Sequence, residues 1–231
     1  MCFSAEASFG ASAAILTIGV LSMGKSRTVA QRVFSCIPII FSVQQFTEGV
    51  LWSSLTHPGM TAWVNISTYT FLLFAQVVWP VIIPLSIRLL ENQAGRQKIL
   101  DIILIIGVLV SAFLGYILLT GRVQSSISCH HIEYDVNYPK WLTNLSIFYF
   151  ITTVISPIIS SIKKVRLLGL VILISYLFTR LFYDQYLISV WCYFAALISI
   201  VILSVIVELN RPNLQAGIKR FAIRRASGGA S

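Results

Sequence analysis

The chain has 231 residues, of which 57% are hydrophobic and 11% charged, and its 17 Lys and Arg outnumber its 8 Asp and Glu to give a net charge of +9. A soluble domain has roughly 45–50% apolar and about 25% charged residues, so this composition excludes disorder and most water-soluble folds. It is the composition of a membrane protein, whose first partner is the lipid bilayer.

Seven apolar stretches approach or exceed the roughly 20 residues that an α-helix needs to cross about 30 Å of hydrocarbon. Short connections with Gly, Pro or charged residues separate them, and no linker divides the chain into two compositional halves. The sequence therefore predicts an all-α polytopic protein, with one transmembrane bundle over residues 1–210. The predicted spans are Ala5–Met23, Val33–Leu55, Trp63–Ile87, Ile99–Thr120, Trp141–Ile162, Val165–Tyr183 and Leu187–Glu208.

The basic residues predict the orientation of the bundle, because short cytoplasmic loops are enriched in Lys and Arg. Fourteen of the 17 lie in the first, third and fifth connections and in the tail, whereas Arg122, Lys140 and Arg180 lie on the other side. We therefore expect the N-terminus outside and the C-terminus in the cytoplasm. The positive charge then reflects topology, and no nucleic-acid partner is expected.

The two ends of the chain have their own patterns. Ser4 followed by Glu6 is typical of a helix N-terminus, where a hydroxyl and an acid both interact with unpaired N–H groups. The tail over residues 211–231 is basic, and its segment Leu214–Arg225 alternates apolar and basic residues. That pattern fits either an amphipathic helix on anionic lipid or a frayed tail, followed by a low-complexity end expected to be disordered.

Glu48 is the one acidic residue deep inside a predicted span, and burying a carboxylate in a membrane costs at least about 2.5–3.5 kcal/mol. Gln44, Glu48 and Trp52 are spaced four residues apart with Gln45 beside them, so the four share one side of the second helix. Either this stripe binds a ligand or proton, or it makes a hydrogen bond between helices that tightens their packing.

Thiols and imidazoles gather on the predicted outer side. Cys2, Cys129 and Cys192 are compatible with a disulfide, a zinc or copper site, or free thiols. The metal-ligand candidates are Cys2, Glu48, His130 and Cys192, although no Cys-x-x-Cys or His-x-x-x-His spacing supports them, and the leading expectation is no cofactor. Cys2 and His130 are also the catalytic candidates, as nucleophile and base.

Two further features concern the helices themselves. Trp79-Pro80 and Pro84 place two helix breakers in the inner half of the third span, where they release backbone carbonyls and predict a kink. A faint repeat, in which Phe46-Thr47 recurs as Phe178-Thr179 and Phe74-Ala75 as Phe194-Ala195, is compatible with two parallel three-helix units joined by a fourth helix.

Several motifs together suggest a family. The chain begins Met1-Cys2-Phe3-Ser4-Ala5, and it continues with Gln44-Gln45-x-x-Glu48-Gly49, Trp79-Pro80 and Ser189-x-Trp191-Cys192. In these motifs it resembles, over most of its length, a family of small bacterial multi-span membrane proteins that form a domain of unknown function. The resemblance implies a shared fold and a bacterial inner (plasma) membrane location, and it lends no activity. A glycine is usual in that family where Cys129 stands, which leaves Cys2 and Cys192 as the better thiol candidates.

The leading functional hypothesis is a ligand-binding membrane protein, a small-solute or ion transporter or sensor, whose site opens to the outside between the second, sixth and seventh helices. Its buried acid binds a proton or cation, while amides and indoles orient and enclose the ligand and a loop His and Tyr gate it. These residues are Gln44, Gln45, Glu48, Trp52, His130, Tyr134 and Trp191. The sequence shows no matching polar route to the cytoplasm. The alternatives are a metal- or thiol-dependent enzyme of the outer leaflet acting on lipid or thiol substrates, and a structural subunit of a homo-oligomer or larger membrane complex.

Overall fold

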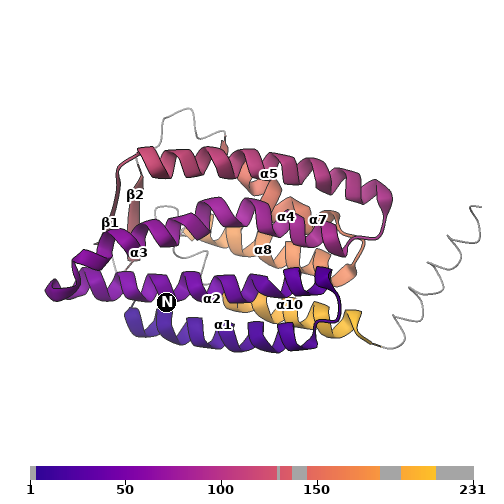
Figure 1. Ribbon diagram of the computed structural model, residues 1–231, viewed down its shortest axis with the longest axis horizontal. Helices are drawn as coiled ribbons and strands as arrows, with labels where there is room; N and C mark the ends of the chain where they lie inside the picture. The colour runs from indigo at the N-terminus through magenta and orange to yellow at the C-terminus, as the bar shows by residue number, and fades with distance from the viewer. Residues whose placement is uncertain (1–3, 129–130, 137–144, 183–193, 212–231) are drawn as a thin grey trace, which may run out of the picture.

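The computed structural model describes residues 4–128, 131–136, 145–182 and 194–211. These residues form a bundle of long helices that lie side by side, with a two-stranded hairpin at one end (Figure 1). The helical segments are α1 Ala5–Lys25, α2 Val29–Thr56, η1 Pro58–Met60, α3 Ala62–Leu72, η2 Leu73–Val78, α4 Trp79–Leu90, α5 Ala94–Thr120, α6 Leu145–Phe150, η4 Ile151–Ile155, α7 Ser156–Ile159, α8 Lys163–Phe182 and α10 Ala195–Leu209. The strands are β1 Val123–Ser128 and β2 His131–Val136.

Among the described residues, five helices are long and apolar enough to cross a membrane: α1, α2, the continuous α3–η2–α4, α5 and α8. They correspond to the first four predicted spans and the sixth, so the mostly helical fold of membrane type is confirmed. The fifth and seventh predicted spans coincide with shorter apolar helices, Leu145–Ile159 and Ala195–Leu209. Residues 137–144 and 183–193, upstream of these two helices, lie outside the described part of the chain, so the prediction of seven spans stays a prediction. The nature of the tail beyond residue 211 also stays a prediction.

The first two helices begin at the hydroxyl caps that their sequences favour. The N–H of Ala7 donates to Ser4 Oγ at 3.2 Å, which confirms the predicted start of α1. The N–H of Gln31 donates in the same way to Thr28 Oγ1 at the start of α2. Each cap satisfies one of the N–H groups that the first helical turn leaves without a partner.

The third and fifth predicted spans share an interruption. Each contains a π-helical segment, η2 or η4, and in each a proline stands two residues after the last residue of that segment, at Pro80 and Pro157. Proline has no N–H, so a carbonyl one turn earlier loses its helical donor and the helix widens locally. The kink predicted at Trp79-Pro80 stays a prediction, and the departure from the regular α-helix described there is η2. The shared π-helical segment and proline relate the third predicted span to the fifth. The predicted repeat instead pairs the third span with the seventh, so this feature does not test it and the repeat stays a prediction.

Three glycines let helices approach these and other prolines closely. A Cβ at Gly107 of α5 would overlap the carbonyl oxygen of Pro80, and one at Gly169 of α8 would lie 3.1 Å from Pro157 Cβ. A Cβ at Gly19 of α1 would likewise meet Pro38 of α2 at 3.3 Å. Small residues at such contacts allow the van der Waals packing that holds helices together in lipid.

The hairpin at the end of the bundle was not expected from the all-α prediction. Its strands are antiparallel, and Val123 pairs with Val136 and Ser128 with His131. Ile132 and Val136 are buried, while Glu133 and Asp135 between them are exposed. The apolar side of β2 packs on the ends of α2 and α3, which is why this loop orders as a strand pair instead of remaining irregular.

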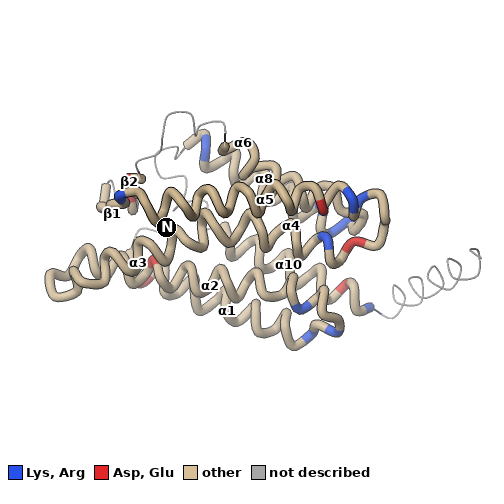
Figure 2. Tube along the Cα trace, turned by 45° about the horizontal axis from the view of Figure 1, so that its top comes forward, with Lys and Arg blue, Asp and Glu red and all other residues tan. Residues whose placement is uncertain are grey.

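The basic residues are unevenly distributed along the bundle axis. Lys and Arg gather mainly at the end where α1, α4 and α10 finish and α2, α5 and α8 begin (Figure 2). Two ion pairs lie at that end, Arg88 with Asp101 at 2.7 Å and Lys164 with Glu208 at 2.9 Å. We call this the basic end, and the end that carries the hairpin the hairpin end.

Candidate functional site

The polar stripe predicted on the second span lies in the interior of the bundle. Gln44, Gln45 and Glu48 are at most 1% exposed, and Trp52 is 5% exposed. All four belong to α2, which packs against α1, α3, α4 and α10. The predicted site was expected between the second, sixth and seventh helices. The seventh, α10, is a neighbour of α2, but the sixth, α8, is not among its main neighbours in the described residues.

Glu48 and Gln45 contact each other within the stripe. Gln45 Nε2 donates a hydrogen bond to Glu48 Oε2 at 2.7 Å, as the spacing of three residues on one helix allows. The hydrogen bond from the amide offsets part of the free-energy cost of burying the carboxylate. The offset is only partial because the amide is a neutral donor and brings no opposite charge. A fully buried acid held by an amide is a group that can take up a proton or a cation.

Gln44 connects the stripe to the break in the third span. Trp79 Nε1 donates to Gln44 Oε1 at 2.8 Å, and the indole ring of Trp79 stacks on Phe41 with ring centroids 3.9 Å apart. The stacking holds the indole over α2 while its N–H fixes the amide. Gln44 is therefore positioned by the first residue of α4, next to Pro80.

Two buried polar atoms near Glu48 have no hydrogen-bond partner among the described residues: Ser8 Oγ and Trp52 Nε1. Ser8 is on α1, which runs antiparallel to α2, with Ser12 Oγ donating to Ser42 O at 2.8 Å. Phe9, one turn before Ser12 on α1, has its ring where a Cβ at Gly49 of α2 would lie. Ser8 is next to Phe9, so it lies at the level of Gln45 to Gly49. Unsatisfied buried polar atoms are costly, so Ser8 Oγ at this level and Trp52 Nε1 one turn beyond Glu48 mark a place where a ligand or water belongs.

The hairpin packs on the Trp52 end of this stripe. Ile132 is fully buried and packs in one cluster with Leu51 and Trp52. Tyr134, a predicted gate residue, borders the same cluster and stacks on Phe71 of α3, with ring centroids 4.9 Å apart and planes at 3°. The structure therefore brings Tyr134 near Trp52.

Several predicted site residues lie outside the described part of the chain, namely Cys2, Cys129, His130, Trp191 and Cys192. The disulfide, metal and catalytic predictions that depend on them stay predictions. Within the residues that the structure describes, no group of three or more His, Cys, Asp or Glu side chains could hold a metal ion. Cys36, on the part of α2 nearer the basic end, is a free and half-buried thiol.

A second polar cluster, which the sequence did not point to, lies at the basic end around Glu91. Glu91 follows α4 and is 1% exposed. Its Oε1 accepts the N–H groups of Asn92 and Gln93 at 2.9 Å, and its Oε2 accepts the N–H of Ser161 at 2.6 Å. The hydroxyl of Ser161 also donates to Oε1 at 2.7 Å. One carboxylate thus joins the α4–α5 connection to the α7–α8 connection.

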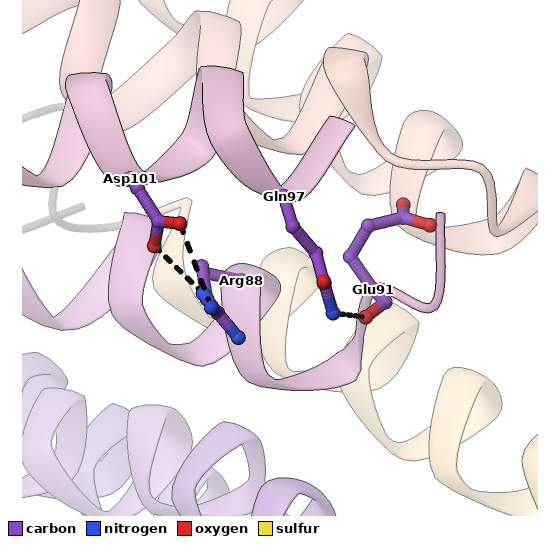
Figure 3. Close-up of polar contacts among 4 residues, drawn as sticks. All are labelled: Arg88, Glu91, Gln97 and Asp101. Carbon is purple, nitrogen blue, oxygen red and sulfur yellow. Dashed lines mark hydrogen bonds and ion pairs between the residues drawn. The ribbon is translucent and has the colours of Figure 1, made fainter. Parts of the chain in front are cut away.

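Neighbouring side chains hold the same two connections. Gln97 Nε2 donates to the backbone carbonyl of Glu91 at 2.6 Å, while one turn away Arg88 pairs with Asp101 (Figure 3). Arg96 Nη1 donates across to the carbonyl of Ile159 at the end of α7. These hydrogen bonds and the ion pair therefore connect the end of α4, the start of α5 and the end of α7.

The hydrogen bonds decide the charge of Glu91. Burial alone would raise the pKa of this carboxyl, but the donors from Ser161, Gln93 and Asn92 favour the charged form and hold its pKa below the ordinary value. Glu91 is therefore an anion at neutral pH. A sequence signal for this role was weak, because Glu91 and Ser161 are 70 residues apart.

No curated protein and no solved structure matches the chain, so neither kind of comparison assigns an activity to these residues. A family match covers nearly the whole chain, from residue 1 to residue 216, and includes every helix described above. The chain belongs to this family, which is described as a family of unknown function (DUF6629).

Proposed function

We propose that this protein is an integral membrane protein that binds a small solute or ion at a polar site around Glu48 and acts as a transporter or sensor. The observation that carries the proposal is the position of Glu48, fully buried in a helix long and apolar enough to cross a membrane. Ser8 and Trp52 support it, because each contributes a buried polar atom without a partner among the described residues at or next to that level. In the proposed site Glu48 holds a cation or proton, Gln45 orients the carboxylate and Trp52 forms a wall.

The proposed site faces the outside of the cell. The basic end of the bundle is expected in the cytoplasm, because cytoplasmic loops are enriched in Lys and Arg. The hairpin, at the opposite end, then covers the outer opening of the site. In this arrangement Tyr134 lies where a ligand would enter.

Ligand binding is tested with purified protein in detergent, by measuring the thermal unfolding midpoint across a panel of monovalent cations, pH values and small polar solutes. A ligand at 100 times its dissociation constant adds about 2.7 kcal/mol, which raises the midpoint by roughly 5–10 °C. We expect at least one condition to stabilise the wild type and to have no effect on Glu48→Gln.

Glu133→Gln is the control for this experiment, because it removes an exposed carboxylate from the hairpin near the same end of the bundle. It should keep the full response of the wild type. A wild-type response that survives in Glu48→Gln for every ligand in the panel contradicts the proposal.

Orientation is tested separately by labelling single cysteines in intact cells with a membrane-impermeant maleimide, in a background where the four native cysteines are replaced. Ser126→Cys lies on an exposed part of β1, and Asn92→Cys on the exposed α4–α5 connection. We expect Ser126→Cys to react in intact cells and Asn92→Cys only after the membrane is permeabilised. The reverse pattern would place the hairpin in the cytoplasm.

A further inference from the structure

The start of α8 and the α1–α2 connection are both attached to the last turn of α10 at the basic end. Lys164 of α8 pairs with Glu208 at 2.9 Å and donates to the carbonyl of Ser204 at 3.3 Å. Asn210, two residues after Glu208, donates from Nδ2 to the carbonyl of Lys25 at 2.7 Å, and Lys25 is the last residue of α1. The end of α10 is therefore a junction of three parts of the chain.

Exposed Lys and Arg side chains lie around this junction, at the end of the bundle where Figure 2 shows the basic residues gathered. Of the carboxylates at this end in the described part of the chain, Glu91 is buried, and Asp101 and Glu208 each form an ion pair. The described residues thus leave the junction with a net positive charge, which attracts anions. The exposed basic residues are Lys25, Arg27, Arg32, Lys163, Arg166 and Arg211.

One side of α8 combines two of these cations with exposed apolar side chains. Lys163 and Arg166 are among the first four residues of α8 and are exposed. Leu167, Leu170 and Ile174, at spacings of three and four residues from them, lie on the same side of the helix and are 48%, 47% and 57% exposed. We call these three side chains the apolar row of α8. Because α8 is long and apolar enough to cross a membrane, the row is a surface for hydrocarbon directly beside a positive charge.

We propose that this side of α8 binds an anionic phospholipid, with the phosphate group on Lys163 and Arg166 and the acyl chains along the apolar row. Arg binds phosphate through two parallel hydrogen bonds and Lys binds it as a point charge. A soluble phosphate ion would contact the two cations and leave the apolar row uncovered, so the combination favours a lipid. Clusters of Lys and Arg next to a membrane-spanning helix attract anionic lipids in this way. The inference does not depend on the Glu48 site.

Glu208 controls how much positive charge the lipid meets. Its ion pair with Lys164, the neighbour of Lys163, neutralises one cation beside the site. Arg211 adds an exposed cation within one turn, because its N–H donates to the carbonyl of Glu208 at 3.0 Å. Removing the carboxylate of Glu208 is therefore expected to strengthen the binding of an anionic lipid, and removing Lys163 and Arg166 to weaken it.

Lipid binding is measured with purified protein in detergent, by following the thermal unfolding midpoint as phosphatidylglycerol or phosphatidylcholine is added. A lipid that binds the folded state raises the midpoint as its concentration passes its dissociation constant. We expect phosphatidylglycerol to reach half of its effect at a concentration at least about tenfold lower than phosphatidylcholine, whose headgroup has no net charge. Glycerol 3-phosphate at the same concentrations should have no effect, because it has no acyl chains to cover the apolar row.

Two double variants with the same change in net charge form the decisive comparison. Lys163→Gln combined with Arg166→Gln should raise the half-effect concentration of phosphatidylglycerol by roughly 30-fold, at about fivefold for each cation removed. Lys98→Gln combined with Arg122→Gln also removes two exposed cations, but these lie near the two ends of α5. This control should change the half-effect concentration by less than about twofold, because neither cation belongs to the site.

Glu208→Gln should have an effect of the opposite sign. It releases Lys164 from its carboxylate and should lower the half-effect concentration by about fivefold, a gain that a loosened fold does not produce. Glu133→Gln makes the same change in charge on the hairpin and should leave the half-effect concentration unchanged. Equal effects of these two variants would contradict the proposal.

The remaining outcomes also decide the proposal. Equal responses to phosphatidylglycerol and phosphatidylcholine overturn it, and so does an equal loss in both double variants, which would attribute the response to net charge. Stabilisation by glycerol 3-phosphate would identify the ligand as a soluble anion instead of a lipid. If the lipid-free midpoint shows that a double variant fails to fold, the comparison of Glu208→Gln with Glu133→Gln still decides. Glu48→Gln should respond to phosphatidylglycerol as the wild type does, so the lipid site and the proposed function fail independently.

Discussion

Replacing Gly107 by alanine is expected to lower the thermal unfolding midpoint by roughly 6–12 °C, which corresponds to about 3 kcal/mol for a chain of this size. A Cβ at this position would overlap the carbonyl oxygen of Pro80 and lie 3.0 Å from its carbonyl carbon. Both atoms belong to the backbone of α4 and cannot rotate away. Relief therefore requires α5 to separate from α4, and the measurement is thermal unfolding of purified protein in detergent.

Gly115→Ala is the matched control, because Gly115 lies two turns further along the same helix. A Cβ there would meet only Val77, at 3.6 Å, which is ordinary van der Waals contact. Alanine also has a higher helix propensity than glycine, by up to about 1 kcal/mol. Gly115→Ala should therefore be neutral or slightly stabilising. A Gly107→Ala midpoint equal to that of Gly115→Ala would contradict the close approach of α5 to Pro80.

The second large effect is expected at Glu91. Glu91→Ala leaves the N–H and hydroxyl of Ser161 without their acceptor, at a cost of about 1–3 kcal/mol for each buried group. Because Asn92 and Gln93 are exposed, water can replace the carboxylate at their N–H groups. We expect a total loss of about 2–4 kcal/mol in thermal unfolding, and a smaller loss in Glu91→Gln, whose amide oxygen still accepts.

The same carboxylate makes stability depend on pH. The pKa of Glu91 is lower in the folded protein than in the unfolded chain, where it is about 4.3. Its stabilisation is therefore fully present above the unfolded-state pKa and is lost as the pH falls through the folded-state pKa. The difference in unfolding midpoint between wild type and Glu91→Gln should be largest near neutral pH and should shrink on acidification below about pH 4. A difference that stays constant down to the lowest pH would show that Glu91 is not charged in the folded protein.

The sequence by itself was sufficient for the properties that depend on each residue's own preference for lipid or water. The apolar content and the run lengths predicted a mostly helical protein of membrane type, and Ser4 predicted where α1 begins. The four-residue spacing of Gln44, Glu48 and Trp52 predicted a shared side of α2, and all three are buried in the bundle. Ile132, Tyr134 and Val136 alternate with the acidic Glu133 and Asp135, and this alternation is typical of a β-strand. The all-α prediction did not include this strand.

Only the tertiary structure decided which buried groups meet. Gln44 and Trp79, Pro80 and Gly107, and Glu91 and Ser161 lie on different segments of the chain, and no local pattern links them. Hydropathy reports the solvent that a residue prefers and helical spacing reports which residues share a side. The contacts between helices depend on the fit of side chains far apart in sequence, and that fit is determined when the helices pack.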